Sequence, residues 1–147
     1  GIQNLVSPGT EVILSENGSA SPGADAVIVV VGEHPYAEMQ GDRDNLELSH
    51  EDRAVINTVK ASGSPMAIVL LSGRPMIITT ELNESDAFLA AWLPGTEGDG
   101  IAQVLFGDYA PTGKLSVSWP DSMDQVPINS GDFNYDPLFP LGYGLSY

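Results

Sequence analysis

Cysteine is absent from this sequence and basic residues are scarce: of 147 residues, 5 are lysine or arginine against 20 aspartates and glutamates. The lack of cysteine excludes disulfides, a thiolate nucleophile and a cysteine-based zinc site. The formal net charge of -15 argues against nucleic acid or an anionic membrane surface as a partner, because phosphate binding needs clustered lysine and arginine. A neutral ligand such as a sugar is compatible with that charge.

Long hydrophobic runs are also missing. No apolar run approaches the roughly 18–20 residues that a membrane helix needs, so we expect no insertion into a membrane. The absence of cysteine suits a secreted or bacterial periplasmic protein. The opening residues, Gly1 to Thr10, lack a methionine and resemble the end of a helix followed by a Ser-Pro-Gly break. We therefore expect a piece of a longer polypeptide.

What the sequence does contain is an alternation of apolar runs and helix signals. Ala26–Val31 and Met66–Leu71 are unbroken apolar runs, as expected of parallel strands covered on both faces. Between them, Ser49 is a helix cap, with acidic residues in the first turn and Gly63 after the last. The pattern predicts an α/β fold with a mostly parallel sheet.

Weaker patterns complete the prediction. A helix is expected from about Gly98, with Gly107 after it. Further strands are expected at Thr10–Ser15, Met76–Thr80, Ala87–Leu93 and Leu115–Trp119. We expect residues 1–120 to form the α/β core, and residues 121–147 to be an extended tail that packs on another surface, because the tail is too long for an ordinary connection.

The loop after Ala26–Val31 holds the residues best suited to chemistry, because ligands of open α/β sheets bind beyond the carboxyl ends of the strands. Four carboxylates crowd this loop: Glu33, Glu38, Asp42 and Asp44. Paired carboxylates serve general acid/base catalysis, and cleavage of a glycosidic bond needs two of them. The alternative is a solvated acidic loop, or carboxylates held by Arg43 and Arg74.

Other residue types give weaker signals. His34 could be a base, a metal ligand or a structural hydrogen-bonding group, and His50 lies in the first turn of a helix, so the two do not make a metal site. Tyr36 is placed for ligand contact by its position in the loop. No Gly-x-Ser-x-Gly and no phosphate-binding loop occurs. We expect neither a metal nor a cofactor.

Several motifs in a fixed order are more specific than any one of them. They are Gly32-Glu-His-Pro-Tyr-Ala-Glu38, Leu71-Ser-Gly-Arg-Pro75, Ala90-Ala-Trp-Leu-Pro-Gly-Thr-Glu-Gly98, Leu105-Phe-Gly-Asp108, Thr112-Gly-Lys-Leu115 and Leu141-Gly-Tyr-Gly-Leu145. From about Thr10 to Tyr147, the chain resembles the second domain of family 3 glycoside hydrolases. The nearest type is the plant and marine-bacterial β-glucan exohydrolase.

The resemblance implies a three-layer (α/β)6 sandwich, incomplete here at its N-terminus, that follows a (β/α)8 barrel. It implies a retaining enzyme that releases glucose from the non-reducing ends of β-glucans or oligosaccharides. The nucleophile would be an aspartate of the barrel, outside this chain, so the chain alone would be inactive. The general acid/base would be Glu38, with Glu33 in reserve.

The resemblance also implies roles around Glu38. Tyr36 and Met39 would contact substrate, and the loop would be supported by His34, Asp42, Arg43 and Arg74. The expected partners are a β-glucan or β-glucoside and the N-terminal barrel. One alternative is a non-catalytic structural or glucan-binding module. Another is a flavodoxin-like nucleotide or flavin binder, which the acidic charge and the missing phosphate loop disfavour.

Overall fold

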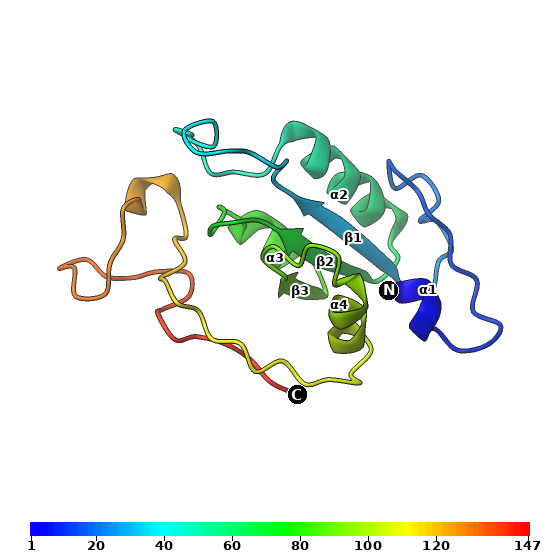
Figure 1. Cartoon of the computed structure of the whole chain (residues 1–147). Helices are drawn as coiled ribbons and strands as arrows, with labels where there is room; N and C mark the ends of the chain where they lie inside the picture. Colours follow the sequence, from blue (N-terminus) through cyan, green and yellow to red (C-terminus); the bar gives the residue numbers. More distant parts are fainter.

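The computed structural model describes residues 1–147 and contains one sheet of three parallel strands in the order β1-β2-β3 (Figure 1). The elements follow one another as α1 (Ile2–Leu5), β1 (Val27–Gly32), α2 (His50–Ser62), β2 (Met66–Leu71), α3 (Thr79–Glu84), β3 (Ala87–Ala90), α4 (Gly98–Leu105) and a 3-10 helix (Met123–Gln125). Strands alternate with helices, which confirms the predicted α/β fold with a parallel sheet.

The central strand β2 pairs with both neighbours. In one ladder Val27 lies opposite Met66 and Gly32 opposite Leu71, and in the other Ala67 lies opposite Ala87. β1 and β2 therefore end at the same level. The segments that follow these two strands leave the sheet side by side.

The helix predicted after Ser49 is confirmed as α2. The Ser49 hydroxyl accepts a hydrogen bond from the Asp52 amide at 3.0 Å, which satisfies one of the free amides of the first turn. Gly63 ends the helix in the left-handed conformation, with φ of 74°. The helix buries Ile56 and Val59 and presents its charged side chains on the other faces.

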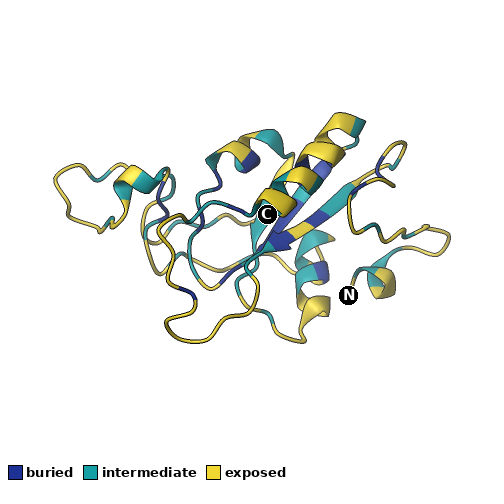
Figure 2. Ribbon diagram, turned by 90° about the horizontal axis from the view of Figure 1, so that it is seen from above, coloured by how far each residue is buried: buried dark blue, intermediate teal, exposed yellow.

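The core lies between α2 and one face of the sheet. The buried strand residues on this face are Val29, Val31, Met66, Ile68 and Leu70, and they pack with Ile56, Val59 and Trp119. Figure 2 shows the buried segments gathered on the strands and the exposed ones in the long loops. On the opposite face of β1, Val30 is 56% exposed, so the prediction that this strand is covered on both faces is wrong for the chain as it stands.

Two of the weaker predictions are wrong because the segments have no strand beside them. Thr10–Ser15 is irregular, and its Leu14 is 92% exposed. In Met76–Thr80, only Ile77 pairs, through a single bridge to Glu47, and helix α3 begins at Thr79. Its alternating apolar residues are nevertheless buried, which is the source of the strand-like pattern.

Two further segments pair as strands over fewer residues than expected. Leu115–Trp119 forms one isolated antiparallel bridge, between Trp119 and Phe139. The Leu141 amide, which would continue this ladder, donates instead to the Tyr135 hydroxyl at 3.1 Å. The predicted strand Ala87–Leu93 is confirmed as β3 but ends at Ala90, because Trp92 takes a left-handed φ of 54° that turns the chain out of the sheet. The helix expected from Gly98 is confirmed as α4.

The tail returns toward the sandwich at several points. The Tyr147 hydroxyl donates to the Val104 carbonyl in α4, and the Thr79 hydroxyl of α3 donates to the Asp121 carbonyl at 2.9 Å. Phe139 packs against the core. The division of the chain at residue 120 stays a prediction. No helix in the structure has the length and apolar character needed to cross a lipid bilayer.

Gly32 is a position where the register of β1 and β2 requires the absence of a side chain. A Cβ at this position would lie 1.9 Å from the Leu71 carbonyl oxygen. We expect Gly32→Ala to lower the free energy of unfolding by about 2–3 kcal/mol, as overpacking against a fixed backbone does. Urea unfolding followed by circular dichroism measures this change.

The matched control is Gly100→Ala. This glycine lies in α4, where an added Cβ meets no atom within 4 Å, and alanine in a helix is favoured over glycine by about 0.5–1 kcal/mol. A Gly32→Ala protein as stable as the Gly100→Ala protein would contradict the assigned register.

Candidate active site at the carboxyl end of the sheet

The acidic loop predicted to carry function extends beyond the carboxyl ends of β1 and β2. In Figure 1 it is the cyan segment that leaves β1 and returns to α2. The Glu33 amide donates to the Leu71 carbonyl at 2.9 Å, so the start of the loop is still joined to β2. The segment after β2, Ser72 to Pro75, lies against it. The fold thus brings Glu33 and Arg74 together, although they are far apart in sequence.

Glu33 is the buried carboxylate of this site, with a side chain only 5% exposed. Its Oε1 accepts hydrogen bonds from Arg74 Nε at 3.0 Å and Arg74 Nη2 at 2.6 Å. Arg43 Nη1 lies 3.6 Å from the same oxygen. A carboxylate is buried at this low exposure only when its charge is paired and hydrogen-bonded, and here two guanidinium groups provide that pairing.

Tyr36 completes this ion cluster. Its hydroxyl donates to Glu33 Oε2 at 3.2 Å, and the Arg74 guanidinium carbon lies 5.0 Å from the centre of its ring. The ring also lies against Gly41, where a Cβ would be 2.2 Å from Tyr36 Cδ2. Tyr36 as a whole is 44% exposed, and its side chain is held by Glu33, Arg74 and the bare backbone of Gly41.

Glu38 lies at the outer tip of the loop and is exposed. Two backbone hydrogen bonds shape the tip: Gln40 N donates to the Ala37 carbonyl at 3.1 Å, and Asp42 N donates to the Met39 carbonyl at 3.2 Å. Met39 has a left-handed φ of 68° and is 80% exposed. The Glu38 side chain has no hydrogen bond or ion pair with the rest of this chain.

The remaining predicted residues fall into two groups. Arg43 joins the ion cluster and also donates from Nη2 to the Glu47 carbonyl at 3.0 Å. The side chains of His34, Asp42 and Asp44 make no hydrogen bond or ion pair with the cluster. No group of three or more histidine, aspartate and glutamate side chains is arranged to hold a metal ion. The roles predicted for these residues stay predictions.

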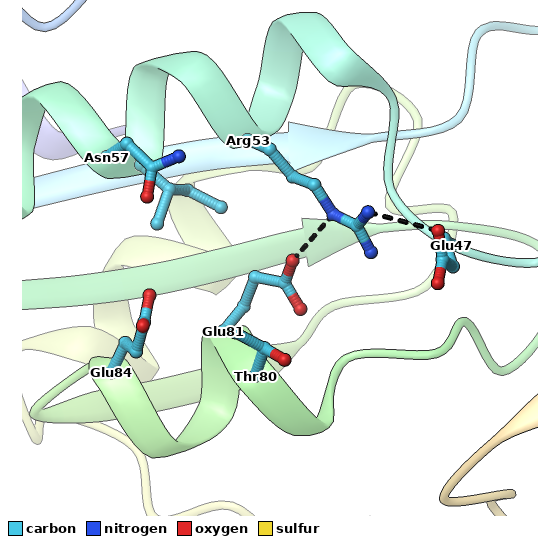
Figure 3. Close-up of a pocket in the computed structure, with 7 residues that line it drawn as sticks. Glu47, Arg53, Asn57, Thr80, Glu81 and Glu84 are labelled. Atoms are coloured by element: carbon cyan, nitrogen blue, oxygen red, sulfur yellow. Dashed lines mark hydrogen bonds and ion pairs between the residues drawn. The ribbon is translucent and has the colours of Figure 1, made fainter.

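A second group of charged residues, which the sequence did not reveal, lines a cleft of about 290 Å³ between α2 and α3 (Figure 3). Arg53 donates from Nε to Glu81 at 2.9 Å and from Nη1 to Glu47 at 3.0 Å. The Glu81 side chain is only 4% exposed. The cleft shares Glu47 with the end of the acidic loop but does not include its tip. Glu81 is missed by the sequence patterns because they predict a strand over Met76–Thr80, whereas a helix begins at Thr79. The contact of Glu81 with Arg53 depends on the packing of α3 against α2, which the sequence does not show.

Bonding within this cleft shifts two pKa values. A hydrogen bond from Asn45, and then the bond and charge of Arg53, hold the pKa of Glu47 below its ordinary value of 4.5. Burial works to lower the pKa of Arg53, but the bonds to Glu47 and Glu81 outweigh burial and raise it above the usual range. Both shifts favour the charged forms of the pair.

Comparison with known proteins gives the family of the chain. The profile of the glycosyl hydrolase family 3 C-terminal domain matches residues 1–147. An exo-1,3/1,4-beta-glucanase from a Pseudoalteromonas species superposes with a TM-score of 0.85 at 48% identity, over 94% of this chain and 18% of that one. The periplasmic beta-glucosidase of Salmonella typhimurium is 38% identical over 93% of this chain and 21% of its own length. A beta-xylosidase of Formosa agariphila is 37% identical over 88% of this chain and 20% of its own length.

The parallel sheet with its acidic loop is thus an α/β domain of the kind found in enzymes that hydrolyse glycosides. The chain belongs to glycosyl hydrolase family 3, to whose C-terminal domain it corresponds along its whole length. It spans about a fifth of the length of the relatives that it matches.

The lowered pKa of Glu47 predicts a loss of stability in acid. Because the pKa is lower in the folded than in the unfolded chain, the stabilisation is present above pH 4.5 and is lost as the pH falls through the lowered value. We expect the urea midpoint of Glu47→Gln to fall less between about pH 5 and pH 3 than that of the wild type. Glu16→Gln, at an exposed glutamate with no ion pair, is the control and keeps the wild-type dependence. Parallel curves for Glu47→Gln and wild type would contradict the prediction.

The packing of Tyr36 on Gly41 predicts that Gly41→Ala loosens the loop. The added methyl group displaces the ring from Arg74, and a cation–π contact is worth about 0.5–1 kcal/mol. Trypsin cleavage after Arg43 should therefore rise about 2–5-fold relative to cleavage after Lys114. Gly100→Ala, where a Cβ meets nothing within 4 Å, controls for substitution as such. An unchanged cleavage ratio in Gly41→Ala would show that the ring does not hold the loop.

Proposed function

We propose that this chain acts as the second domain of a retaining, exo-acting β-glucosidase or β-glucanase and supplies Glu38 as the general acid/base. The observation that carries the proposal is the tip of the acidic loop. It holds an exposed carboxyl, free of partners, on a loop whose base is fixed to the carboxyl ends of two strands. The family to which the chain belongs, and relatives named as beta-glucosidases and an exo-1,3/1,4-beta-glucanase, support this activity.

The reaction needs a second carboxylate. Retaining glycosidases place a nucleophile and an acid/base about 5–5.5 Å apart on either side of the glycosidic bond. In our proposal, an aspartate of an N-terminal barrel domain attacks the anomeric carbon while Glu38 protonates the leaving oxygen. Glu38 then removes a proton from the water that releases the sugar. A general acid must be protonated near neutral pH, which requires burial or a neighbouring carboxylate. The barrel domain would supply both.

The contacts of Glu33 favour Glu38 over the reserve residue. Glu33 is buried, and both of its carboxylate oxygens are bonded within the chain, one to Arg74 and the other to the Tyr36 hydroxyl. A buried carboxylate whose oxygens are both engaged is poorly placed to reach a substrate. Glu38 has no cation paired with it within the chain and is exposed, so that a partner domain could reach it.

The substrate and the cellular location are proposed from the names of the relatives. A β-glucan or β-glucoside is the proposed substrate, which Tyr36 and Met39 would contact from the loop. A relative named as a beta-xylosidase marks xylosides as the alternative to be tested beside glucosides. The Salmonella relative is named as periplasmic, although a Dictyostelium discoideum relative is named as lysosomal. A secreted or periplasmic location is proposed for this protein.

The test compares leaving groups in the enzyme that carries this chain. We expect Glu38→Gln to lower kcat/KM for substrates with poor leaving groups, such as cellobiose, by about 10²–10⁴-fold, the usual contribution of a general acid. For 2,4-dinitrophenyl β-glucoside, whose leaving group needs no proton, kcat/KM should stay within about threefold of wild type. Glu51→Gln, at an exposed glutamate of α2, controls for the loss of one surface charge.

Equal losses for both substrates would refute the role of Glu38 as the acid. Full activity of Glu38→Gln on both substrates would favour the alternative, a non-catalytic module that only packs on the barrel or binds glucan. Binding of laminarin or cellulose oligosaccharides to the same variant separates these two functions of the module.

A further inference from the structure

A single guanidinium joins the start of the loop that carries Glu38 to the residue that follows the turn at its tip. Arg74 Nη2 donates to Glu33 Oε1 and to the Gly41 carbonyl, both at 2.6 Å. Glu33 is the first residue of the loop after β1, and Gly41 follows the turn at its tip. Arg74 itself is fixed, since it lies three residues after β2, where the Ser72 hydroxyl donates to its carbonyl at 2.8 Å. The loop is therefore closed onto the end of the central strand.

We infer that Glu33 and Arg74 form a positioning pair that sets the place of Glu38 relative to the reacting glycosidic oxygen. The inference rests on the proposed function and deepens it. We call the bridge from Glu33 through Arg74 to Gly41 the clamp. Glu38 and the turn at the tip lie between Glu33 and Gly41, and the Tyr36 ring packs between Arg74 and Gly41. Tyr36 thus supports the clamp, with its hydroxyl bonded to Glu33 and its ring against Arg74. In this arrangement Glu33 holds the loop through its charge, and proton transfer falls to Glu38.

The geometry makes a lysine a poor replacement for Arg74. Arg74 bonds Glu33 through Nε and Nη2, and the same Nη2 also bonds the Gly41 carbonyl, all within one planar guanidinium. A lysine offers only a single ammonium on a flexible stem. Arg74→Lys keeps the charge beside Glu33 and loses the planar bridge. It separates the bridging role from the mere neutralisation of a buried carboxylate.

The consequence for catalysis is selective. A misplacement of about 1 Å costs up to about 10²-fold in rate when the misplaced group takes part in the reaction step. Arg74→Ala should therefore lower kcat/KM for cellobiose by about 10–100-fold, and that for 2,4-dinitrophenyl β-glucoside by less than about threefold. Arg74→Lys should fall between Arg74→Ala and wild type for cellobiose. The measurements are made in the enzyme that carries this chain, with folding checked by circular dichroism.

A double variant separates positioning from structural support. If Arg74 acts through Glu38, its effect on cellobiose disappears once Glu38 is glutamine, so Arg74→Ala with Glu38→Gln is no slower than Glu38→Gln alone. Arg53→Ala is the matched control, because Arg53 also bridges two glutamates, Glu47 and Glu81, but away from the tip. Its loss of activity should be equal for both substrates.

The outcomes distinguish the two proposals. Equal losses for both substrates in Arg74→Ala, or additive losses in the double variant, would overturn the positioning role while leaving the acid in place. If Glu38→Gln itself shows no dependence on the leaving group, the proposed function fails and the positioning role fails with it. If Arg74→Ala does not fold, the same comparison is made with Arg74→Lys, for which wild-type behaviour on cellobiose would overturn the inference.

Discussion

The parallel register of β1 and β2 is the constraint on which the rest of the structure depends. With Gly32 opposite Leu71, both strands end at the same level, and the first residue of one loop bonds to the last carbonyl of the other strand. Only a glycine permits this approach, because the Cβ of any other residue at position 32 would meet the Leu71 carbonyl oxygen. A slip by one residue would exchange the buried and exposed faces of β1 and would also separate Glu33 from Arg74. Core packing and the site are thus fixed by the same pairing.

Two buried carboxylates are handled in the same way in this fold. Glu33 and Glu81 each have side chains at or below 5% exposure, and each accepts a hydrogen bond from an arginine on a neighbouring element. A buried pair of this kind adds little net stability, since desolvation offsets most of the attraction, but breaking it leaves a charge without a partner. Such pairs therefore fix which elements lie side by side. Arg53 fixes α2 on α3, and Arg74 fixes the loop on the end of β2.

The sequence predicts well those parts of the fold that depend on local residues. Helix α2 follows from Ser49 and Gly63, and strands β1 and β2 follow from unbroken apolar runs. The strands expected at Thr10–Ser15 and Met76–Thr80 are absent, because a strand exists only where another strand supplies its hydrogen bonds. Local alternation of apolar residues cannot reveal that partner. The candidate site follows the same rule: its loop is visible in the sequence, whereas the pairing of Glu33 with Arg74 arises only when two strand ends meet.

The scarcity of basic residues bears on the tip of the loop. Arg43 and Arg74 are bonded around Glu33, Arg53 bridges Glu47 and Glu81, Lys60 pairs with Glu84, and Lys114 donates to the Gly144 carbonyl. Every lysine and arginine of the chain is therefore already engaged, and none is paired with Glu38. A cation beside a carboxyl keeps it charged and opposes its use as an acid. Because the few cations of this acidic chain are bonded elsewhere, none of them lies beside its exposed carboxyl at Glu38. If Glu38 is the acid, as we propose, closure by a second domain would need only to exclude water from Glu38 and bring another carboxylate near it.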